Sequence, residues 1–333
     1  KTHDILQAVT LNTPDAILIG HSGSTTAHPT VVMLARDLKI AYPKAVIIYG
    51  GVYPTYHWQE ILDHNADIDF IVRGEGEVTI TALLHALEQD FSPATIPGLA
   101  CRENGHAIAT QPAPVITDLD AHRIGWELID FDDYSYWGGK KSVIMQFSRG
   151  RPHLCTYCGQ RGFWTRWRHR DPVKFAAEIA GLVRSHGIEL VNLADENPTS
   201  SRRRWKDFLE ALIAEQVNVI LVGSTRADDI VRDADILPLY KKAGVLRFLL
   251  GIESTDDSVL KTVKKGGTKQ KDQQAIQLLR DHGMIGLCTF AVGFEEERDR
   301  DYWRVLRQLL RYDPDQIMSV YATPHQWTPF FQA

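Results

Sequence analysis

The chain has 333 residues, of which 44% are hydrophobic and 24% are charged, and its formal net charge at pH 7 is −5. This length gives room for two domains of ordinary size, and this composition is typical of a globular protein with a large core. The negative charge disfavours general binding to nucleic acids or to membrane surfaces. No apolar run approaches the roughly 18 to 20 residues of a membrane-spanning helix. We therefore expect a cytoplasmic protein with no nucleic-acid partner and no transmembrane segment.

The first hundred residues alternate between strand and helix patterns. Short apolar runs at 15–22, 45–51 and 68–77 predict buried strands, and the run 29–42 has helical periodicity. Strands that alternate with helices predict a parallel, doubly wound sheet. We place this domain at residues 1–95. Three strands are few for such a sheet, so we expect that its N-terminal strands are missing from the sequence.

Residues 96–140 lack strong periodicity and are predicted to form a linker with short strands. From 141 to 333 the alternation resumes, with helical patterns at 172–187 and 203–216. Six strand–helix units predict a partial parallel barrel of the (β/α)6 type, so the expected fold class is α/β. The six predicted strands are 142–148, 189–195, 217–225, 246–254, 286–294 and 316–324.

Polar side chains recur at the carboxyl ends of these six strands. In parallel barrels the chemistry lies at this end, because the loops that follow the strands converge there. The sequence therefore predicts an active site at this rim. The residues at these strand ends are Ser148, Arg149, Asp195, Glu196, Asn197, Ser224, Thr225, Arg226, Glu253, Ser254, Gly293, Phe294, Glu295, Thr323 and His325.

Two of the four cysteines stand close together, at Cys155 and Cys158, in a loop rich in Gly and Pro. Two thiolates in one turn can bind a single metal centre. An iron–sulfur loop, a zinc half-site with His153 nearby, and a thiol redox pair are all open on this spacing. We interpret Cys101 and Cys288 as small buried hydrophobic side chains.

The loop resembles the cluster loop of radical S-adenosylmethionine enzymes, in which C-x3-C-x-aromatic-C follows the first barrel strand. Cys155, Tyr157 and Cys158 match the aromatic and the last two cysteines of that pattern. The resemblance implies a 4Fe–4S cluster held by Cys155 and Cys158. Arg151 stands where the family has its first cysteine, and arginine cannot act as a thiolate. We therefore expect a cluster that is incomplete and an activity that is impaired.

Other strand ends resemble the same family. "GSTRAD" is similar to the stretch whose arginine, here Arg226, pairs with the methionyl carboxylate of S-adenosylmethionine, and an Arg–carboxylate pair is a strong contact. "GIES" is similar to the ribose-binding stretch, with Glu253, and "VGFEEE" to the adenine-side strand. The alternative is that Arg226 and Glu253 only form ion pairs at the barrel rim. The residues that the resemblance implies for S-adenosylmethionine are Tyr157, Asp195, Ser224, Arg226, Glu253 and Gly293.

The N-terminal domain resembles the cobalamin-binding domains that precede such barrels. Its strand ends carry small residues, which let the backbone approach a large ring closely. No D-x-H-x-x-G stretch is present in the sequence, so no histidine is assigned as a lower cobalt ligand. The alternative is a doubly wound domain that only docks on the barrel. The residues implied for cobalamin are Ser22, Ser24, Thr25, Gly50, Gly51 and Gly74.

Several longer stretches, such as "CGQRGFWTRWRHRDP" and "TPHQWTPFF", resemble the family of anaerobic oxidative cyclases of bacteriochlorophyll biosynthesis. That resemblance implies conversion of magnesium-protoporphyrin IX 13-monomethyl ester to divinyl protochlorophyllide, with a ferredoxin or flavodoxin as electron donor. Aromatic faces can stack on a tetrapyrrole and arginines can take its propionate. The candidate substrate residues are Trp164, Arg166, Trp167 and Arg168.

Other interpretations of the chain and of its basic cluster stay open. A cobalamin-dependent radical methyltransferase has the same two-domain plan, and Arg151 is compatible with a non-catalytic protein that binds tetrapyrrole or cobalamin. The basic cluster at 161–170 is also compatible with a loop that packs on acidic strand-end residues, or with a nucleic-acid patch. The sequence assigns no catalytic residue.

Overall fold

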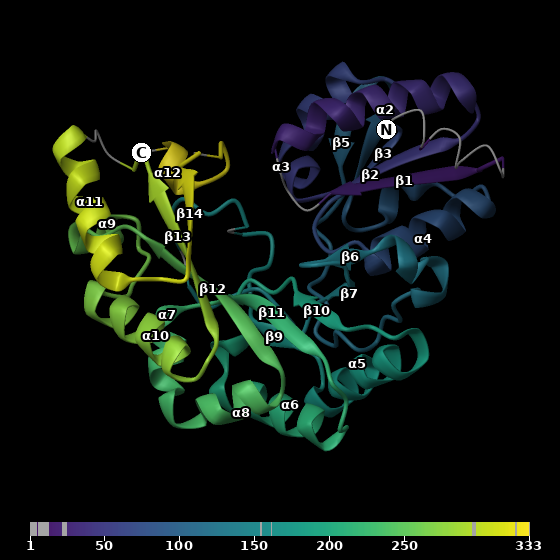
Figure 1. Cartoon of the computed structure of the whole chain (residues 1–333). Coiled ribbons are helices and arrows are strands. Elements are labelled where there is room, and N and C mark those ends of the chain that lie inside the picture. The colour runs from purple at the N-terminus through teal and green to yellow at the C-terminus, as the bar shows by residue number, and fades with distance from the viewer. Residues whose placement is uncertain are drawn as a thin grey trace. The chain divides into compact units, whose positions relative to one another are not determined.

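The computed structural model describes residues 5, 13–21, 25–153, 155–160, 162–294, 298–323 and 325–332. It contains two compact units, Lys1–Thr117 and Asp118–Ala333 (Figure 1). The second unit begins within the segment 96–140, for which we expected a linker.

The first unit is built on a five-stranded sheet of order β1-β2-β3-β4-β5. Its first three strands are parallel, as the alternation of strand and helix patterns predicts. The last two are antiparallel and lie within the predicted linker. The strands are β1 (Ala16–His21), β2 (Val46–Gly51), β3 (Phe70–Val72), β4 (Leu99–Glu103) and β5 (His106–Ala109).

Helices cover both faces of this sheet, which confirms the doubly wound architecture. One core forms between the sheet and the helices α2 (His28–Ala41) and α3 (Val52–His64), with Tyr49 fully buried in it. A second core lies under α4 (Glu77–Glu88) on the opposite face and contains Leu83. Because β1, β2 and β3 are parallel, their carboxyl ends lie at one edge of the sheet.

The second unit contains a sheet of order β14-β13-β12-β11-β10-β7-β6. The six strands from β7 to β14 are parallel and neighbouring strands follow one another in sequence, which confirms the partial barrel. A short strand, β6 (Ser135–Tyr136), pairs antiparallel with β7 at one edge. The six strands are β7 (Lys140–Met145), β10 (Leu190–Leu193), β11 (Ile220–Thr225), β12 (Val245–Glu253), β13 (Ile285–Val292) and β14 (Gln316–Tyr321).

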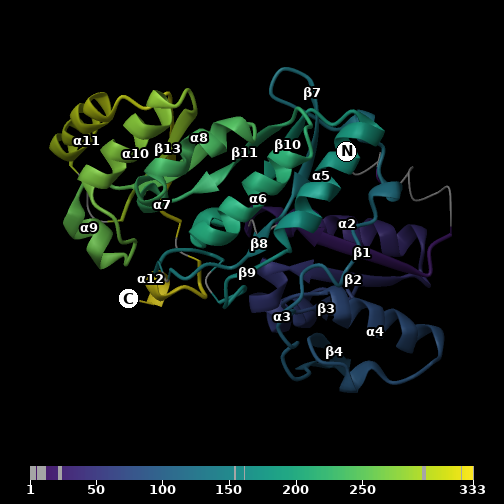
Figure 2. The same ribbon diagram turned by 90° about the horizontal axis from the view of Figure 1, so that it is seen from below.

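Helices pack along the outer face of this curved sheet, as Figures 1 and 2 show. The core between them includes the fully buried Trp205, Phe208 and Phe248. The inner face of the sheet is left for the site. The helices of the outer face are α5 (Pro172–His186), α6 (Arg202–Ala214), α7 (Ala227–Arg232), α8 (Leu237–Lys242), α9 (Asp257–Thr262), α10 (Lys269–Asp281) and α11 (Asp299–Tyr312). A last short helix, α12 (Pro329–Gln332), follows the strand β14.

Candidate active site

The two close cysteines lie in a loop that follows the first barrel strand and returns on itself. A two-stranded antiparallel ribbon, β8 (Ser148–Arg149) and β9 (Arg168–His169), closes the base of this loop. Cys155 is buried, with 2% of its surface exposed, and Cys158 is half-buried. The loop is therefore fixed at its base and carries both thiols at the strand end.

The base of the loop requires a glycine. Gly150 has a φ of +79°, a conformation that residues with a Cβ rarely adopt. A Cβ added to Gly150 would lie 2.3 Å from the carbonyl oxygen of Arg166. The two sides of the loop can approach each other only because this position has no side chain.

Asp195, at the end of β10, holds the start of the cysteine loop. Its carboxylate accepts hydrogen bonds from the backbone N–H of Phe147 (3.0 Å) and from the N–H and the hydroxyl of Ser148 (2.5 Å each). Complete burial raises the pKa of Asp195 to about 7, although these hydrogen bonds act to lower it. We interpret Asp195 as a positioning residue, and its contact with S-adenosylmethionine stays a prediction.

Arg151 lies beside the thiols. Its Nε is 3.6 Å from Oε2 of the nearly buried Glu196, and its guanidinium is within hydrogen-bonding reach of the Cys158 side chain. Burial alone would lower the pKa of Arg151, but Cys158, Glu196 and Cys155 outweigh burial and raise it. Arg151 is therefore a fixed positive charge at this end of the barrel.

The residues around Cys155 and Cys158 fit a 4Fe–4S cluster only in part. The pattern that the loop resembles has three cysteines, and this chain has arginine at the first position. Among the residues that the structure describes, no group of three or more His, Cys, Asp or Glu side chains could hold a metal ion. The disagreement is confined to position 151, since both remaining thiols are free.

Arg226 follows β11 and lies at the same rim. Its Nη2 donates to Oδ2 of Asp228 (3.0 Å) and to the carbonyl oxygen of Lys265 (2.9 Å). Its Nε is buried and has no hydrogen-bond partner in the described part of the chain. The cation of Arg226, after burial, lowers the pKa of His153. Arg226 therefore has a donor left for a ligand, close to the cysteine loop.

Glu253 ends β12 with a φ of +66°, at an irregularity in its pairing with β13. One carboxylate oxygen lies 3.3 Å from Nζ of Lys265. Burial raises the pKa of Tyr157, and the carboxylate of Glu253 and the thiols of Cys155 and Cys158 raise it further. The structure thus brings the cysteine loop and the end of β12 together.

A C-terminal segment, residues 325–332, packs on the cysteine loop. Trp327 Nε1 donates to the carbonyl oxygen of Gly159 (2.8 Å), and the N–H of Phe330 donates to the carbonyl oxygen of Thr156 (3.1 Å). A Cβ on Gly159 would lie 2.7 Å from the ring of His325. The loop is therefore held by the C-terminal segment as well as by the ribbon at its base.

The other predicted residues of the barrel are less closely gathered. Ser224 is half-buried on β11, and Gly293, after β13, has a φ of +90°. A Cβ added to Gly293 would meet no atom within 4 Å. Trp167 donates from Nε1 to the carbonyl oxygen of Asn197 (3.2 Å), while Trp164 packs edge-on against Phe163. The two remaining substrate candidates, Arg166 and Arg168, contact each other through the Arg168 Nε and the Arg166 carbonyl oxygen. Their contact with a substrate stays a prediction.

In the first unit, the predicted cobalamin residues that are described follow the strand ends. Gly51 and Gly74 have positive φ values of 121° and 79°, and Gly50 precedes them on β2. Thr55 joins their loops, because its hydroxyl donates to the Gly51 carbonyl oxygen (2.7 Å) and accepts from the Gly74 N–H (2.9 Å). Thr25 begins a short 3-10 helix after β1. The predicted Ser22 and Ser24 lie outside the described residues, as does Glu295 of the barrel.

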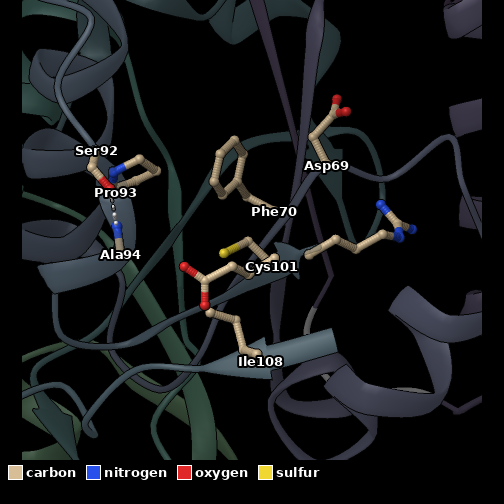
Figure 3. Close-up of a pocket in the computed structure, with 9 residues that line it drawn as sticks. Asp69, Phe70, Ser92, Pro93, Ala94, Cys101 and Ile108 are labelled. Atoms are coloured by element: carbon tan, nitrogen blue, oxygen red, sulfur yellow. Dashed lines mark hydrogen bonds between the residues drawn. The ribbon is translucent and has the colours of Figure 1, made fainter. Parts of the chain in front are cut away.

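The other two cysteines are buried in ordinary packing. Cys101 lies on β4 of the first unit, next to Phe70 and Ile108 at a small pocket (Figure 3). Cys288 is fully buried on β13, and burial raises the pKa of its thiol to about 12. The side chains that affect the Cys288 thiol electrostatically are Asp272 and Asp315, not the residues of the cysteine loop.

Sequence reasoning missed three residues that organise these sites. Lys265 lies in "KKGG", twelve positions after Glu253, and no pattern indicates that it returns to the strand end. Trp327 is far along the chain from Gly159. Thr55 alone had a usable signal, because it follows the paired glycines at the start of a helix.

Two family models match the chain. The model of the radical SAM superfamily matches residues 145–309, and the model of the B12 binding domain matches residues 1–84. The chain belongs to the radical SAM superfamily of enzymes, with a B12 binding domain before the radical SAM domain. Domains of these kinds use a 4Fe–4S cluster, S-adenosylmethionine and cobalamin, so the predicted set of cofactors is confirmed at the level of the domains.

Curated relatives show which members of the superfamily the chain is similar to. The chain is 56% identical over 328 residues to the anaerobic magnesium-protoporphyrin IX monomethyl ester cyclase of Synechocystis sp., covering 98% of this chain and 66% of the relative. It is 34% identical to the cyclase of the same name from Rubrivivax gelatinosus, covering 98% of this chain and 60% of that protein. The chain therefore spans about two thirds of the length of these relatives or less.

Solved structures share the fold. A structure of the radical S-adenosylmethionine methyltransferase TsrM from Kitasatospora setae, with cobalamin and a 4Fe–4S cluster bound, matches with a TM-score of 0.78 and 15% identity, covering 99% of this chain and 66% of that one. The cobalamin-dependent enzyme OxsB matches with a TM-score of 0.77 and 18% identity, covering 100% and 48%. Within the described residues, no helix has the length and apolar character to cross a membrane.

Proposed function

We propose that this chain forms the isocyclic ring of bacteriochlorophyll precursors, converting magnesium-protoporphyrin IX monomethyl ester to divinyl protochlorophyllide without molecular oxygen. The observation that carries this proposal is the 56% identity to the Synechocystis cyclase over 98% of the chain. We further propose that it works in the cytoplasm and takes electrons from a ferredoxin or a flavodoxin, because the 4Fe–4S cluster of a radical SAM domain has to receive an electron from a redox partner.

The residues of the rim are suited to bind and orient S-adenosylmethionine. The free Nε of Arg226 can pair with its methionyl carboxylate, and Glu253 can accept hydrogen bonds from its ribose hydroxyls. Tyr157 packs edge-on against Phe294 with 5.0 Å between ring centroids, and this pair can shield the bound cofactor from water. In radical SAM enzymes the cluster and this cofactor together supply a carbon-centred radical that removes a hydrogen atom from the substrate.

Arg151 sets a limit on this activity. Because only two of the three cluster cysteines are present, we propose that the chain assembles its cluster poorly. Its guanidinium also places a positive charge beside the two thiols and pairs with Glu196. Replacing arginine by cysteine at 151 restores the family pattern and removes that charge.

The test compares the unchanged protein with the Arg151→Cys variant after anaerobic reconstitution with iron and sulfide. We expect the variant to bind about four irons per chain, to cleave S-adenosylmethionine on reduction, and to form a five-ring product from the monomethyl ester. The unchanged protein should bind less iron, cleave less S-adenosylmethionine and form less product. A variant with four irons and intact cofactor cleavage, but with no five-ring product, would contradict the cyclase assignment.

One observation favours a second function. The same Arg151 is compatible with a protein that binds tetrapyrrole or cobalamin without turning it over. Tight binding of the monomethyl ester by both proteins, without product even in the Arg151→Cys variant, would support this binding function. A methylated product would instead support a cobalamin-dependent methyltransferase.

A further inference from the structure

An arginine lies on the inner face of the barrel sheet, away from the rim. Strand pairing places Ile144, Asn192, Val222 and Arg247 in one row across β7, β10, β11 and β12. Their sequence neighbours, such as Val143 and Phe248, belong to the core under the helices. Because side chains alternate along a strand, the row faces the side of the sheet that the helices leave uncovered.

Arg247 is paired with aromatic rings instead of a carboxylate. Its guanidinium carbon lies 5.7 Å from the ring centroid of Tyr136 and 5.2 Å from that of Trp137, both in the hairpin at β6. Nη2 is 3.2 Å from the Tyr136 hydroxyl. Across the described residues, Arg247 forms no ion pair with an Asp or a Glu, and its buried Nε has no hydrogen-bond partner.

This arrangement leaves a charge partly unsatisfied. The rings hold the guanidinium in place through cation–π contact and stacking. They do not satisfy the Nε–H, and a buried donor without a partner costs free energy. A ligand carboxylate at the Nε edge would remove that cost and neutralise the charge.

A cavity of about 430 Å³ shares one residue, Tyr136, with the surroundings of this arginine. Tyr136 lines the cavity and also contacts Arg247, and Ile144 and Asn192 line it from the same row of the sheet. Tyr134 and Trp126 add further aromatic surface. Ile144 is 67% exposed, although it faces the inside of the barrel. The cavity therefore offers apolar and aromatic surface next to one cationic group.

We propose that Arg247 binds a free carboxylate of the substrate while this cavity takes an adjoining part of its apolar ring system. The inference rests on the proposed function. Protoporphyrin has two propionate side chains, so its monomethyl ester keeps one free carboxylate and its dimethyl ester keeps none. Arg247 then distinguishes the monomethyl ester from the diester. It also orients the ring, because it binds the one propionate that carries no methyl group.

The test measures dissociation constants for the magnesium-porphyrin monomethyl and dimethyl esters from the fluorescence anisotropy of the pigment. We expect the unchanged protein to bind the monoester at least about tenfold more tightly, since a charged hydrogen bond contributes about 1.5 kcal/mol or more. The Arg247→Gln variant should bind both esters equally, at the level of the diester. The Arg203→Gln variant, altered at an exposed position on α6, should keep the preference.

Two further variants guard against a folding defect. Arg247→Lys keeps a cation on the same strand and should retain a reduced preference for the monoester. Tyr136→Phe keeps the aromatic ring and should retain most of the preference for the monoester. If Arg247→Gln binds pigment but discriminates between the esters as well as the unchanged protein does, the role of Arg247 is overturned and the proposed function stands. If the unchanged protein binds neither ester, the proposed function fails, and this inference fails with it.

Discussion

Arg226 and Glu253, at the ends of two neighbouring barrel strands, are held by the two ends of one residue, Lys265. The Lys265 carbonyl oxygen accepts from Arg226 Nη2 at 2.9 Å, and its ammonium group lies 3.3 Å from a Glu253 carboxylate oxygen. The side chains of Glu253 and Lys265 are both largely buried. One loop therefore sets the spacing between the residues proposed to bind the carboxylate and the ribose of S-adenosylmethionine.

The first prediction concerns the ammonium group of Lys265. The Lys265→Met variant loses the pair with Glu253 but keeps the backbone contact with Arg226, so we expect it to fold normally. Glu253, which has a φ of +66°, should lose its fixed orientation. S-Adenosylmethionine should bind about tenfold more weakly, which corresponds to about 1.4 kcal/mol. Isothermal titration calorimetry would measure this.

The exposed Lys261 on α9 supplies the control. Lys261→Met removes the same charge four positions earlier, without touching Glu253, and should bind S-adenosylmethionine normally. An unchanged affinity in Lys265→Met would show that Lys265 does not position the site.

Much of the barrel could be predicted because its signals are local. Each strand shows a short apolar run that ends in polar residues, so the rim position of Asp195, Arg226 and Glu253 follows from counting along the sequence. Parallel strands bring their carboxyl ends to one edge, and this places the three residues on one rim. The spacing of Cys155 and Cys158 indicates a metal or redox loop, and only the resemblance to the radical S-adenosylmethionine pattern favours the iron–sulfur interpretation.

The contacts between these residues could not be predicted, because they depend on loops that return from a distance. Lys265 reaches Glu253 across a helix, and Trp327 reaches Gly159 from 168 positions away. Arg247 appears as one more polar residue within a strand, and nothing in its neighbourhood predicts that a hairpin places Tyr136 and Trp137 against it. Strand and helix patterns predict the order and direction of the elements. They do not predict contacts between residues that are distant in the sequence.

The second prediction concerns the pH dependence of stability. Asp272 on α10 is only 4% exposed, and its Oδ2 has no hydrogen-bond partner among the described residues. Burial raises the pKa of Asp272 from 3.8 to about 7, against the opposing effect of Lys265. Between about pH 4 and 7 the folded protein therefore keeps a proton that the unfolded chain has lost. Stability should fall as pH rises through that range, by about 2 kcal/mol or about 5 °C in melting temperature.

The Asp272→Asn variant mimics the protonated form, so its melting temperature should change less between pH 5 and pH 8. Part of the slope should persist, because burial also raises the pKa of Asp195 to about 7. Asp281→Asn, at an exposed position of the same helix, should keep the full slope. Equal slopes in Asp272→Asn and the unchanged protein would show that Asp272 is ionised in the folded state.

The third prediction concerns the base of the cysteine loop. Gly150→Ala adds a Cβ 2.3 Å from the Arg166 carbonyl oxygen at a φ of +79°, so the two sides of the loop must separate. We expect a loss of about 2 kcal/mol in stability, typical of strain at such a position, and lower iron uptake in the Arg151→Cys background.

Gly181→Ala is the matched control. Gly181 lies within α5, and an added Cβ there has no atom within 4 Å. Alanine is the better helix former, so this variant should gain up to about 1 kcal/mol and take up iron normally. Thermal unfolding and iron content report on both variants. If Gly150→Ala matched Gly181→Ala in both measurements, the loop would not need its glycine.

The last prediction concerns the C-terminal segment that covers the cysteine loop. Trp327→Phe keeps an aromatic ring but removes the donor that binds the Gly159 carbonyl oxygen at 2.8 Å. Because this bond ties residues 325–332 to the loop, its loss should let the loop open more often. Amide hydrogens of residues 155–160 should then exchange several-fold faster, as measured by mass spectrometry, with little change elsewhere. Trp303→Phe, at a position that is 61% exposed on α11, should leave the exchange of the loop unchanged. Equal exchange in the two variants would mean that the backbone contact of Phe330 with Thr156 holds the segment without the indole.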